Sequence, residues 1–190
     1  MPVDKQQKYS DNEILTQIQE YNHSELYSVL YNRYEQKVLD KCYSLLKDKE
    51  LAKEFTADIL TRTYERLGSF KKSASFSSWL YSITYNYCID YLRSKKKLHY
   101  PNWNDSNEIP EIIDEQDDET AQISYEELMN ALEKIHPEEK TLIMMKYHDN
   151  ISIKEIAEAL RVSESAAKMR LKRAKARILF IIKESNEQIK

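Results

Sequence analysis

The sequence predicts an all-α protein with two small helical domains, residues 10–97 and 120–187, joined by an acidic, flexible linker. One glycine and four prolines are spread over 190 residues, so few positions interrupt helices. Apolar side chains recur at the i, i+3, i+4 and i+7 spacing of amphipathic helices in both segments. Residues 98–119 lack this period, contain Pro101 and Pro110 and are rich in Asp, Glu and Asn, which is typical of a linker.

Two helices are expected at the start of the first domain. Ser10 and Glu13 have the spacing of a capping box, in which each side chain accepts a hydrogen bond from the other residue's backbone N–H. A short helix of about ten residues should therefore begin here. A longer helix should follow, starting at Asn22 or Ser24 and ending near Leu46.

Two further helices complete this domain. Asp48 can cap a third helix over Lys49–Leu67, and Gly68, the single glycine, stands where a left-handed residue would end it. After a loop over Ser69–Ser75, a fourth helix is expected over Phe76–Lys96.

The second domain should contain a helix-turn-helix. A helix over Thr120–Ile135 is expected first, and Pro137 then suits the first position of another helix. Ser152 and Glu155 form another capping box at the start of an amphipathic helix, which breaks at Arg161–Ser163. Ser163 can cap the helix that follows.

This last helix has a small, apolar inner side and a basic outer side. Between Arg161 and Arg177 there are seven basic residues and one acidic residue. A capped helix, a tight turn and a basic second helix suit the major groove of DNA. The alternative is a solvated cationic helix on an ordinary bundle. The inner residues are Ala167, Leu171, Ala174 and Ile178.

The net charge of −3 does not itself indicate a nucleic-acid partner, but charge is strongly segregated along the chain. Residues 104–120 hold eight acidic and no basic side chains, whereas Arg93–Lys97 holds four bases in five positions. Arg93–Lys97 and Arg161–Arg177 are the local basic patches expected of a DNA-binding protein.

Composition also argues against other classes of protein. No apolar run approaches the roughly 20 residues that span a bilayer, and the polar N-terminus has no signal-peptide core, so we expect a cytoplasmic protein. No phosphate loop or nucleophile–base cluster is present, so we predict no catalytic residue, cofactor or metal site. Cys42 and Cys88 should be buried, reduced thiols, with a zinc site or a disulfide as alternatives.

The fourth helix combines aromatic and basic side chains. Six aromatic residues lie within Phe76–Tyr91, directly before the basic run. Aromatic rings can stack on unpaired bases, and Lys and Arg bind phosphates. On the outer side of this helix, the residues either contact nucleic acid or are ordinary surface residues without such a partner, and the sequence leaves both possibilities open. The spacing predicts a core side of Phe76, Trp79, Leu80, Ile83 and Tyr87, and places Tyr81, Tyr85, Asn86 and Arg93 on or near other sides.

Three segments, in this order around an acidic linker, resemble bacterial sigma factors of the sigma-70 family, of the two-domain extracytoplasmic-function (ECF) type. Asp48–Phe70 is similar to the family's segment that binds the polymerase clamp. Phe76–Arg93 has aromatic and polar residues at the family's spacing, and Leu132–Arg177 contains EIAEAL and the K-x-R of the helix-turn-helix. The resemblance implies a protein that binds the β and β′ subunits of core RNA polymerase, directs it to promoters and helps to melt promoter DNA.

The resemblance also implies three groups of site residues. Core polymerase would be bound by Glu50, Glu54, Asp58 and Arg62, with Phe55 and Ile59 behind them. The minus-ten element, including a flipped base of the melted non-template strand, would be bound by Phe70, Lys71, Lys72, Ser73, Phe76, Tyr81, Tyr85, Asn86, Arg93 and Lys96. The minus-thirty-five element would be bound as duplex by Ser163, Ser165, Lys168, Met169, Arg170, Lys172 and Arg173.

The remaining expectations concern partners and departures from the family's pattern. The linker would thread through the polymerase toward the RNA exit path, and an anti-sigma factor or other recruiting protein is a further expected partner. Lys71-Lys72 replaces a more usual Arg-Gly, so the base-capture loop is expected either to prefer a different base or to bind the DNA backbone more strongly. Arg161 stands where the turn usually has glycine. Either the turn differs slightly, or Arg161 tolerates a left-handed backbone, at a cost of about 1 kcal/mol relative to glycine, for an extra phosphate contact.

Other hypotheses fit parts of the chain. A free-standing helix-turn-helix regulator would bind a palindromic site as a dimer. It would leave the aromatic and basic helix and the acidic linker without a role. A helical adaptor that binds only proteins would not need the basic helix.

Overall fold

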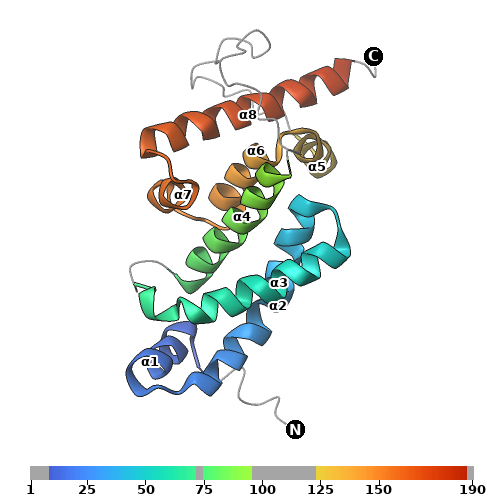
Figure 1. The fold of residues 1–190 in the computed structure, drawn as a ribbon. Coiled ribbons are helices and arrows are strands. Elements are labelled where there is room, and N and C mark those ends of the chain that lie inside the picture. The colour runs from blue at the N-terminus through green and yellow to red at the C-terminus, as the bar shows by residue number, and fades with distance from the viewer. Residues whose placement is uncertain (1–8, 72–74, 96–122, 188–190) are drawn as a thin grey trace. The chain divides into compact units, whose positions relative to one another are not determined.

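The computed structural model describes residues 9–71, 75–95 and 123–187, and every regular element in these ranges is helical. This confirms the all-α fold class. Contacts divide the chain into two units, Met1–Ser94 and Lys95–Lys190, whose elements are labelled in Figure 1. The linker predicted over residues 98–119 lies outside the described residues, so its bounds stay a prediction.

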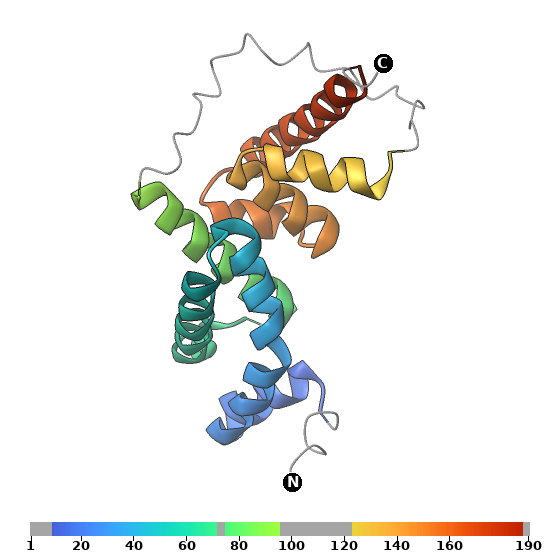
Figure 2. The ribbon, with the colours of Figure 1, turned by 90° about the vertical axis from the view of Figure 1, so that its right-hand side faces the viewer.

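Unit 1 is built around three helices, α2 (Tyr27–Leu46), α3 (Lys49–Glu65) and α4 (Phe76–Ser94), each of which packs against the other two. The shorter α1 (Asp11–Tyr21) packs on α2, as the views of Figures 1 and 2 show. The Tyr34 hydroxyl of α2 donates to Asp11 at 2.5 Å and so joins the two helices.

Side-chain caps fix the starts of these helices largely as the sequence predicts. Ser10 and Glu13 form the expected capping box, in which the Glu13 carboxylate accepts the Ser10 N–H at 2.6 Å. The Asp48 carboxylate accepts two N–H groups of the first turn of α3, each at 3.1 Å. A 3-10 turn, η1 (Ser24–Leu26), occupies the predicted start of the second helix, and α2 follows it.

Gly68 does not end α3 as the sequence predicts. The helix ends at Glu65, and Gly68 lies in a 3-10 turn, η2 (Leu67–Ser69), without a positive φ. The Phe70 N–H donates to the Leu67 carbonyl at 3.1 Å. Because 3-10 hydrogen bonds satisfy the terminal groups here, no left-handed residue is needed.

The predicted outer side of α4 is wrong at two positions. Only 9% of Tyr81 and 1% of Tyr85 is exposed. The Lys41 Nζ atom of α2 lies 4.0 Å from the Tyr81 ring centre and 5.6 Å from that of Tyr85. Since α4 packs on α2 and α3 at once, its buried arc is wider than the single stripe that its sequence indicates. Three residues predicted for the core are only half-buried, namely Trp79, Ile83 and Tyr87.

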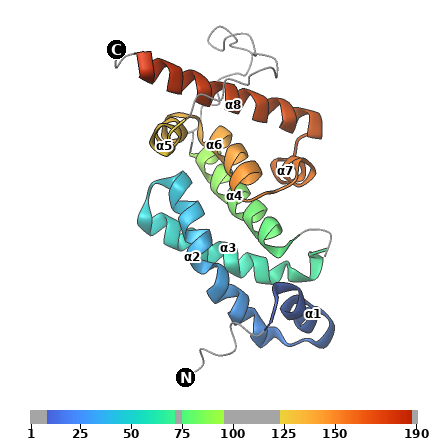
Figure 3. The ribbon, with the colours of Figure 1, turned by 180° about the vertical axis from the view of Figure 1, so that it is seen from behind.

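In unit 2, one long helix packs across three short ones, as Figure 3 shows from behind. A π-helical turn, η3 (Met144–His148), extends the second short helix. Pro137 occupies the first position of that helix, as predicted. The four helices are α5 (Tyr125–Lys134), α6 (Pro137–Ile143), α7 (Ile153–Leu160) and α8 (Glu164–Glu187).

Capping boxes also set the starts of α5 and α7. The box at α7 is the predicted one, with the Ser152 N–H donating to Glu155 at 2.9 Å. A second box, between Ser124 and Glu127, starts α5 at Tyr125. The predicted start near Thr120 is therefore wrong, because the extended backbone of Ser124, at φ −68° and ψ 154°, begins the helix only after this residue.

Candidate polymerase-binding and nucleic-acid-binding surfaces

One face of α3 presents charged side chains above a buried apolar base. The exposed row consists of Glu50, Glu54, Asp58 and Arg62, which follow one another at every fourth position. Phe55 and Ile59 lie behind the row, with 6% and 0% of their surfaces exposed. A charged row on a rigid apolar base suits a protein surface of complementary charge.

Tyr87 on α4 supports the C-terminal half of this row. Its hydroxyl donates to Asp58 Oδ2 at 3.0 Å, and the Arg62 guanidinium lies 4.8 Å from the ring centre. Phe55 packs edge-on against the same ring at 4.8 Å between centroids. Desolvation, and then the hydrogen bond to Asp58, raise the pKa of the Tyr87 phenol. Sequence reasoning missed this role, because no local pattern links residues so distant in the chain.

An aromatic cluster joins the two ends of the segment between α3 and α4. Phe70 precedes this segment and Phe76 follows it, and only 5% and 2% of these side chains is exposed. The Phe70 ring centre lies 4.9 Å from that of Trp79 and 6.0 Å from that of Phe76. Both ends of the predicted base-capture loop are thus fixed by one cluster.

The other predicted minus-ten residues differ in accessibility. Lys71 and Arg93 are exposed, and Asn86 is half-buried. Arg93 pairs with Asp90, one turn earlier on α4, at 3.7 Å between Nη1 and Oδ1. Among the predicted minus-ten residues of α4, Asn86 and Arg93 are therefore accessible, whereas Tyr81 and Tyr85 are buried. Lys72, Ser73 and Lys96 lie outside the described residues.

The turn of the helix-turn-helix has a left-handed arginine. Arg161 ends α7 with φ 54° and ψ 45°, which decides between the two alternatives that the sequence leaves open. The next N–H, of Val162, donates to the Ala157 carbonyl at 3.0 Å and closes the helix end. The Ser163 hydroxyl then accepts an N–H from the first turn of α8 at 3.1 Å, as predicted.

The two sides of α8 are those that the sequence predicts. Its inner residues are buried, with at most 7% of any side chain exposed: Ala167 and Ala174 at 0%, Ile178 at 6% and Leu171 at 7%. On the outer side, Ser163, Ser165, Lys168 and Met169 are exposed, whereas Arg170, Lys172 and Arg173 are half-exposed. The structure therefore brings the predicted minus-thirty-five residues together on one helix and the turn before it.

Arg177, at the end of the basic segment, forms an ion pair with an acidic side chain of α6 inside unit 2. Its Nε lies 3.4 Å from Glu139 Oε1 on α6, and the Glu139 carboxylate also accepts the His136 N–H at 3.2 Å. Burial raises the pKa of Glu139 even though Arg177 and the His136 N–H act in the opposite direction. One of the seven basic residues of this segment thus pairs within the fold.

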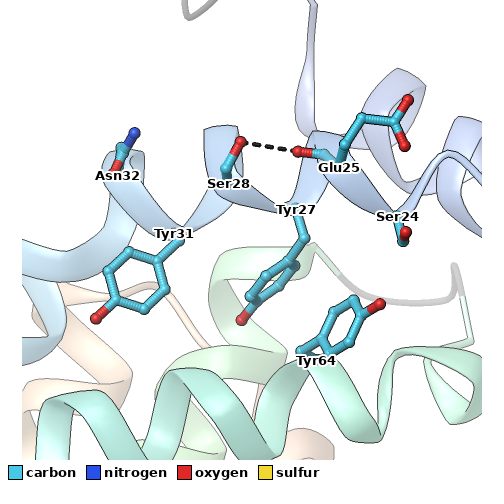
Figure 4. Close-up of a pocket in the computed structure, with 7 residues that line it drawn as sticks. All are labelled: Ser24, Glu25, Tyr27, Ser28, Tyr31, Asn32 and Tyr64. Atoms are coloured by element: carbon cyan, nitrogen blue, oxygen red, sulfur yellow. Dashed lines mark hydrogen bonds between the residues drawn. The ribbon is translucent and has the colours of Figure 1, made fainter.

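A shallow pocket of about 340 Å³ lies on unit 1, between the start of α2 and α3. Figure 4 shows tyrosine side chains of both helices on its wall, and the Tyr27 and Tyr64 ring centres are 4.9 Å apart. The Tyr27 hydroxyl donates to the Leu60 carbonyl at 2.5 Å. Glu25 is the only charged residue among those lining the pocket, so no acid–base pair meets there.

The described residues form neither a metal site nor a membrane span. No three His, Cys, Asp or Glu side chains in the described ranges are grouped so that they could hold a metal ion. Among the helices that the structure describes, none has the length and hydrophobicity that a bilayer crossing requires.

Two parts of the chain match models of one protein family. Residues 30–98 match Sigma-70 region 2, and residues 125–178 match Sigma-70, region 4. The ECF RNA polymerase sigma factor SigW of Bacillus subtilis (strain 168) is 30% identical over 152 residues, which cover 75% of this chain and 81% of SigW. SigX of the same strain, also an ECF sigma factor, is 26% identical over 154 residues, or 76% and 77% of the two chains.

Two solved structures share the fold of this chain. CnrH, in complex with the cytosolic domain of CnrY, has a TM-score of 0.60 and 16% identity and covers 92% of this chain and 97% of its own. RpoE of Bartonella quintana, in complex with the anti-sigma factor NepR, has a TM-score of 0.54 and 17% identity over 78% and 91% of the chains. Sigma factors are non-enzymatic initiation factors. The chain belongs to the sigma-70 family and is an ECF sigma factor, a protein of promoter-directed transcription initiation.

Proposed function

We propose that this chain is a cytoplasmic promoter-specificity subunit with no catalysis of its own, which binds core RNA polymerase through the β and β′ subunits. Unit 1 also opens the minus-ten element, and unit 2 binds the minus-thirty-five element as duplex. One observation carries the proposal: a single chain has both the charged α3 face on its apolar base and a helix-turn-helix with a basic outer side. A free-standing regulator accounts only for the second feature.

The polymerase-binding surface is the exposed face of α3. Three of the four side chains in its row are acidic, so the complementary surface on the polymerase is basic. Phe55 and Ile59 act from below as packing residues. Tyr87 belongs to this surface as a positioning residue, since it contacts both Asp58 and Arg62.

Minus-ten recognition uses the segment that follows Phe70 together with the polar side of α4. Flipping a base out of the duplex costs a few kcal/mol of lost stacking and pairing. Contacts with the base in a protein pocket must offset this cost. Lys71, Asn86 and Arg93 make the direct contacts in this proposal, with Lys72, Ser73 and Lys96 beside them. The buried rings of Tyr81 and Tyr85 position α4 on α2 through Lys41.

Minus-thirty-five recognition uses α8. Lys168, Arg170 and Arg173 bind phosphates and so set the position of the helix on the duplex. Ser165, Met169 and Lys172 lie nearer the base edges, and Ser163 caps the end of the helix that enters the groove.

The proposal extends to the linker and to a regulatory partner. Residues 98–119 pass through a basic channel of the polymerase, where their acidic side chains take the place of nucleic acid. An anti-sigma factor sequesters the chain, by analogy with the two similar structures, which are complexes with NepR and with the cytosolic domain of CnrY.

Reconstituted transcription tests the proposal. The purified chain is added to core polymerase and to a library of promoter fragments, and the RNA products are sequenced. We expect initiation at promoters with two spaced upstream elements, and only weak binding of duplex DNA by the chain alone. Tight binding to a palindromic site without polymerase, with no stimulation of initiation, would instead support the regulator.

A further inference from the structure

Cys42 of α2 and Cys88 of α4 face each other in the core of unit 1. Their Sγ atoms are 3.7 Å apart, and neither side chain has exposed surface. They are the only two cysteines of the chain and are separated by 46 positions. Both are free thiols, as the sequence predicts. The polymerase-binding and DNA-binding surfaces proposed above use neither of them.

We propose that Cys42 and Cys88 are a covalent modification site, a dithiol that a hydroperoxide converts into one intramolecular disulfide between α2 and α4. A disulfide has an S–S distance of about 2.05 Å, so the two sulfurs must approach by about 1.7 Å. Side-chain rotation and a small shift of either helix can supply this movement. No partner molecule is needed to bring the thiols together.

The hydrogen bond between the thiols shifts their pKa values in opposite directions. The Cys88 S–H donates to Cys42, which lowers the pKa of the Cys42 thiol, and a hydrogen bond with Thr56 acts in the same direction. The hydrogen bond with Cys42, and then burial, raise the pKa of Cys88. The thiolate is the reactive form, so the hydrogen bond of the closed pair favours Cys42 as the first nucleophile, whereas either sulfur can react first once α2 and α4 separate.

Hydrogen peroxide can oxidise the two thiols to a disulfide in two steps. The Cys42 sulfur attacks one peroxide oxygen, the O–O bond breaks, and Cys42 becomes a sulfenic acid while the other oxygen leaves as water with the thiol proton. The Cys88 sulfur then attacks the Cys42 sulfur, the S–O bond breaks, and a second water leaves with the Cys88 proton. Two thiols lose two electrons in total, and one peroxide is reduced to two waters.

Complete burial determines when the reaction occurs. Peroxide reaches the sulfurs only when α2 and α4 separate locally, so oxidation should be slow in the folded chain and faster in mild denaturant. The bond would then tie α2 to the helix that the proposed function assigns to the minus-ten element. That consequence rests on the proposed function, whereas formation of the bond does not.

The test uses the full chain, reduced, freed of reductant and treated with hydrogen peroxide. We expect the intact mass to fall by about 2 Da, and a non-reducing digest to contain the Cys42 peptide joined to the Cys88 peptide. Dithiothreitol should restore two alkylatable thiols. The unfolding midpoint of unit 1 should rise by several degrees, because the bond closes a long loop of the unfolded chain. The Cys88→Ser variant should show no mass loss and should gain about 16 Da at Cys42.

Two outcomes would overturn the proposal. One is oxidation of methionines while both thiols can still be alkylated after unfolding, and the other is a disulfide between two chains. Should Cys88→Ser fail to fold, the joined peptide from the unsubstituted chain decides alone. Failure of the proposed function would be seen separately, as absence of initiation by the reduced chain.

Discussion

The Tyr87 hydroxyl of α4 donates to Asp58 of α3 at 3.0 Å, and the same ring lies under the Arg62 guanidinium. Two side chains of the charged α3 row therefore take their positions from α4, the helix to which we assign minus-ten recognition. Polymerase binding and promoter opening would thus share one rigid contact within unit 1.

Removing the Tyr87 hydroxyl tests this contact. In Tyr87→Phe, Asp58 loses a hydrogen bond of about 0.5–1.5 kcal/mol, so affinity for core polymerase should fall a few-fold with the fold intact. Fluorescence titration of labelled chain with core polymerase measures the affinity. Tyr43→Phe is the matched control, because Tyr43 is half exposed on α2 and lies outside the row. Equal affinities for both variants would remove Tyr87 from the binding surface.

Lys168→Ala with Arg170→Ala should weaken binding to every minus-thirty-five sequence by a similar factor, because phosphate contacts carry no base information. The slope of log K against log salt should become shallower by about 2, because the double variant neutralises two fewer phosphates. Affinity measurements of the polymerase complex over a salt series give this slope. Lys183→Ala, on the exposed C-terminal part of α8, should leave it unchanged. A slope that the double variant does not alter would withdraw both residues from phosphate binding.

Arg161→Gly should stabilise unit 2 by about 1 kcal/mol, because glycine adopts the left-handed backbone at φ 54° without strain. The variant should also bind the minus-thirty-five element less tightly, since it removes an exposed cation beside α8. Urea unfolding and DNA titration measure the two effects. Asn150→Gly relieves a second residue at φ 54° before α7 and should not affect DNA binding. Unchanged stability in Arg161→Gly would show that the turn is not strained.

Asn86→Ala should impair promoter opening more than polymerase association. Asn86 is half-buried on α4, among the residues assigned to the minus-ten element. Permanganate reactivity of unpaired thymines measures opening, and co-purification measures association. Ser82→Ala, one turn earlier, is the control. A variant that opens DNA normally once bound but binds polymerase weakly would move Asn86 to the other surface.

The difference in stability between the Glu139→Gln variant and the unsubstituted chain should depend on pH. Burial raises the pKa of Glu139 above its usual value of 4.5, so the folded chain holds this proton more tightly than the unfolded chain. The stability that Glu139 contributes is full below pH 4.5 and is lost as pH rises through the raised pKa. The variant should therefore gain stability relative to the unsubstituted chain as pH rises from 4.5 toward 7.

Urea midpoints over a pH series measure this difference, and Glu127→Gln is the control. Hydrogen bonds with Ser124 lower the pKa of Glu127. The stability that Glu127 contributes is therefore present above pH 4.5 and is lost as the pH falls below this value, so the stability difference for Glu127→Gln should have the opposite sign. A flat difference for Glu139→Gln would contradict the raised pKa.

Local patterns were sufficient for the capped starts of α1 and α7 and for α8, which has one buried side, but not for the end of α3. The boxes at Ser10 and Ser152 need only residues three positions apart, and α8 buries one stripe of small and apolar residues as predicted. The sequence failed where an element has two neighbours or where distant side chains meet. Burial of Tyr81 and Tyr85 follows from the packing of α4 on α2 and α3, which a single period cannot reveal.

By itself, the sequence determined the helical class, the family resemblance and the basic side of the recognition helix, because these depend on the order and spacing of nearby residues. Only the tertiary structure decided the contact of Tyr87 with Asp58, the pairing of Arg177 with Glu139 and the approach of Cys42 to Cys88. Each of these joins residues at least 29 positions apart, and their approach depends on how whole helices pack.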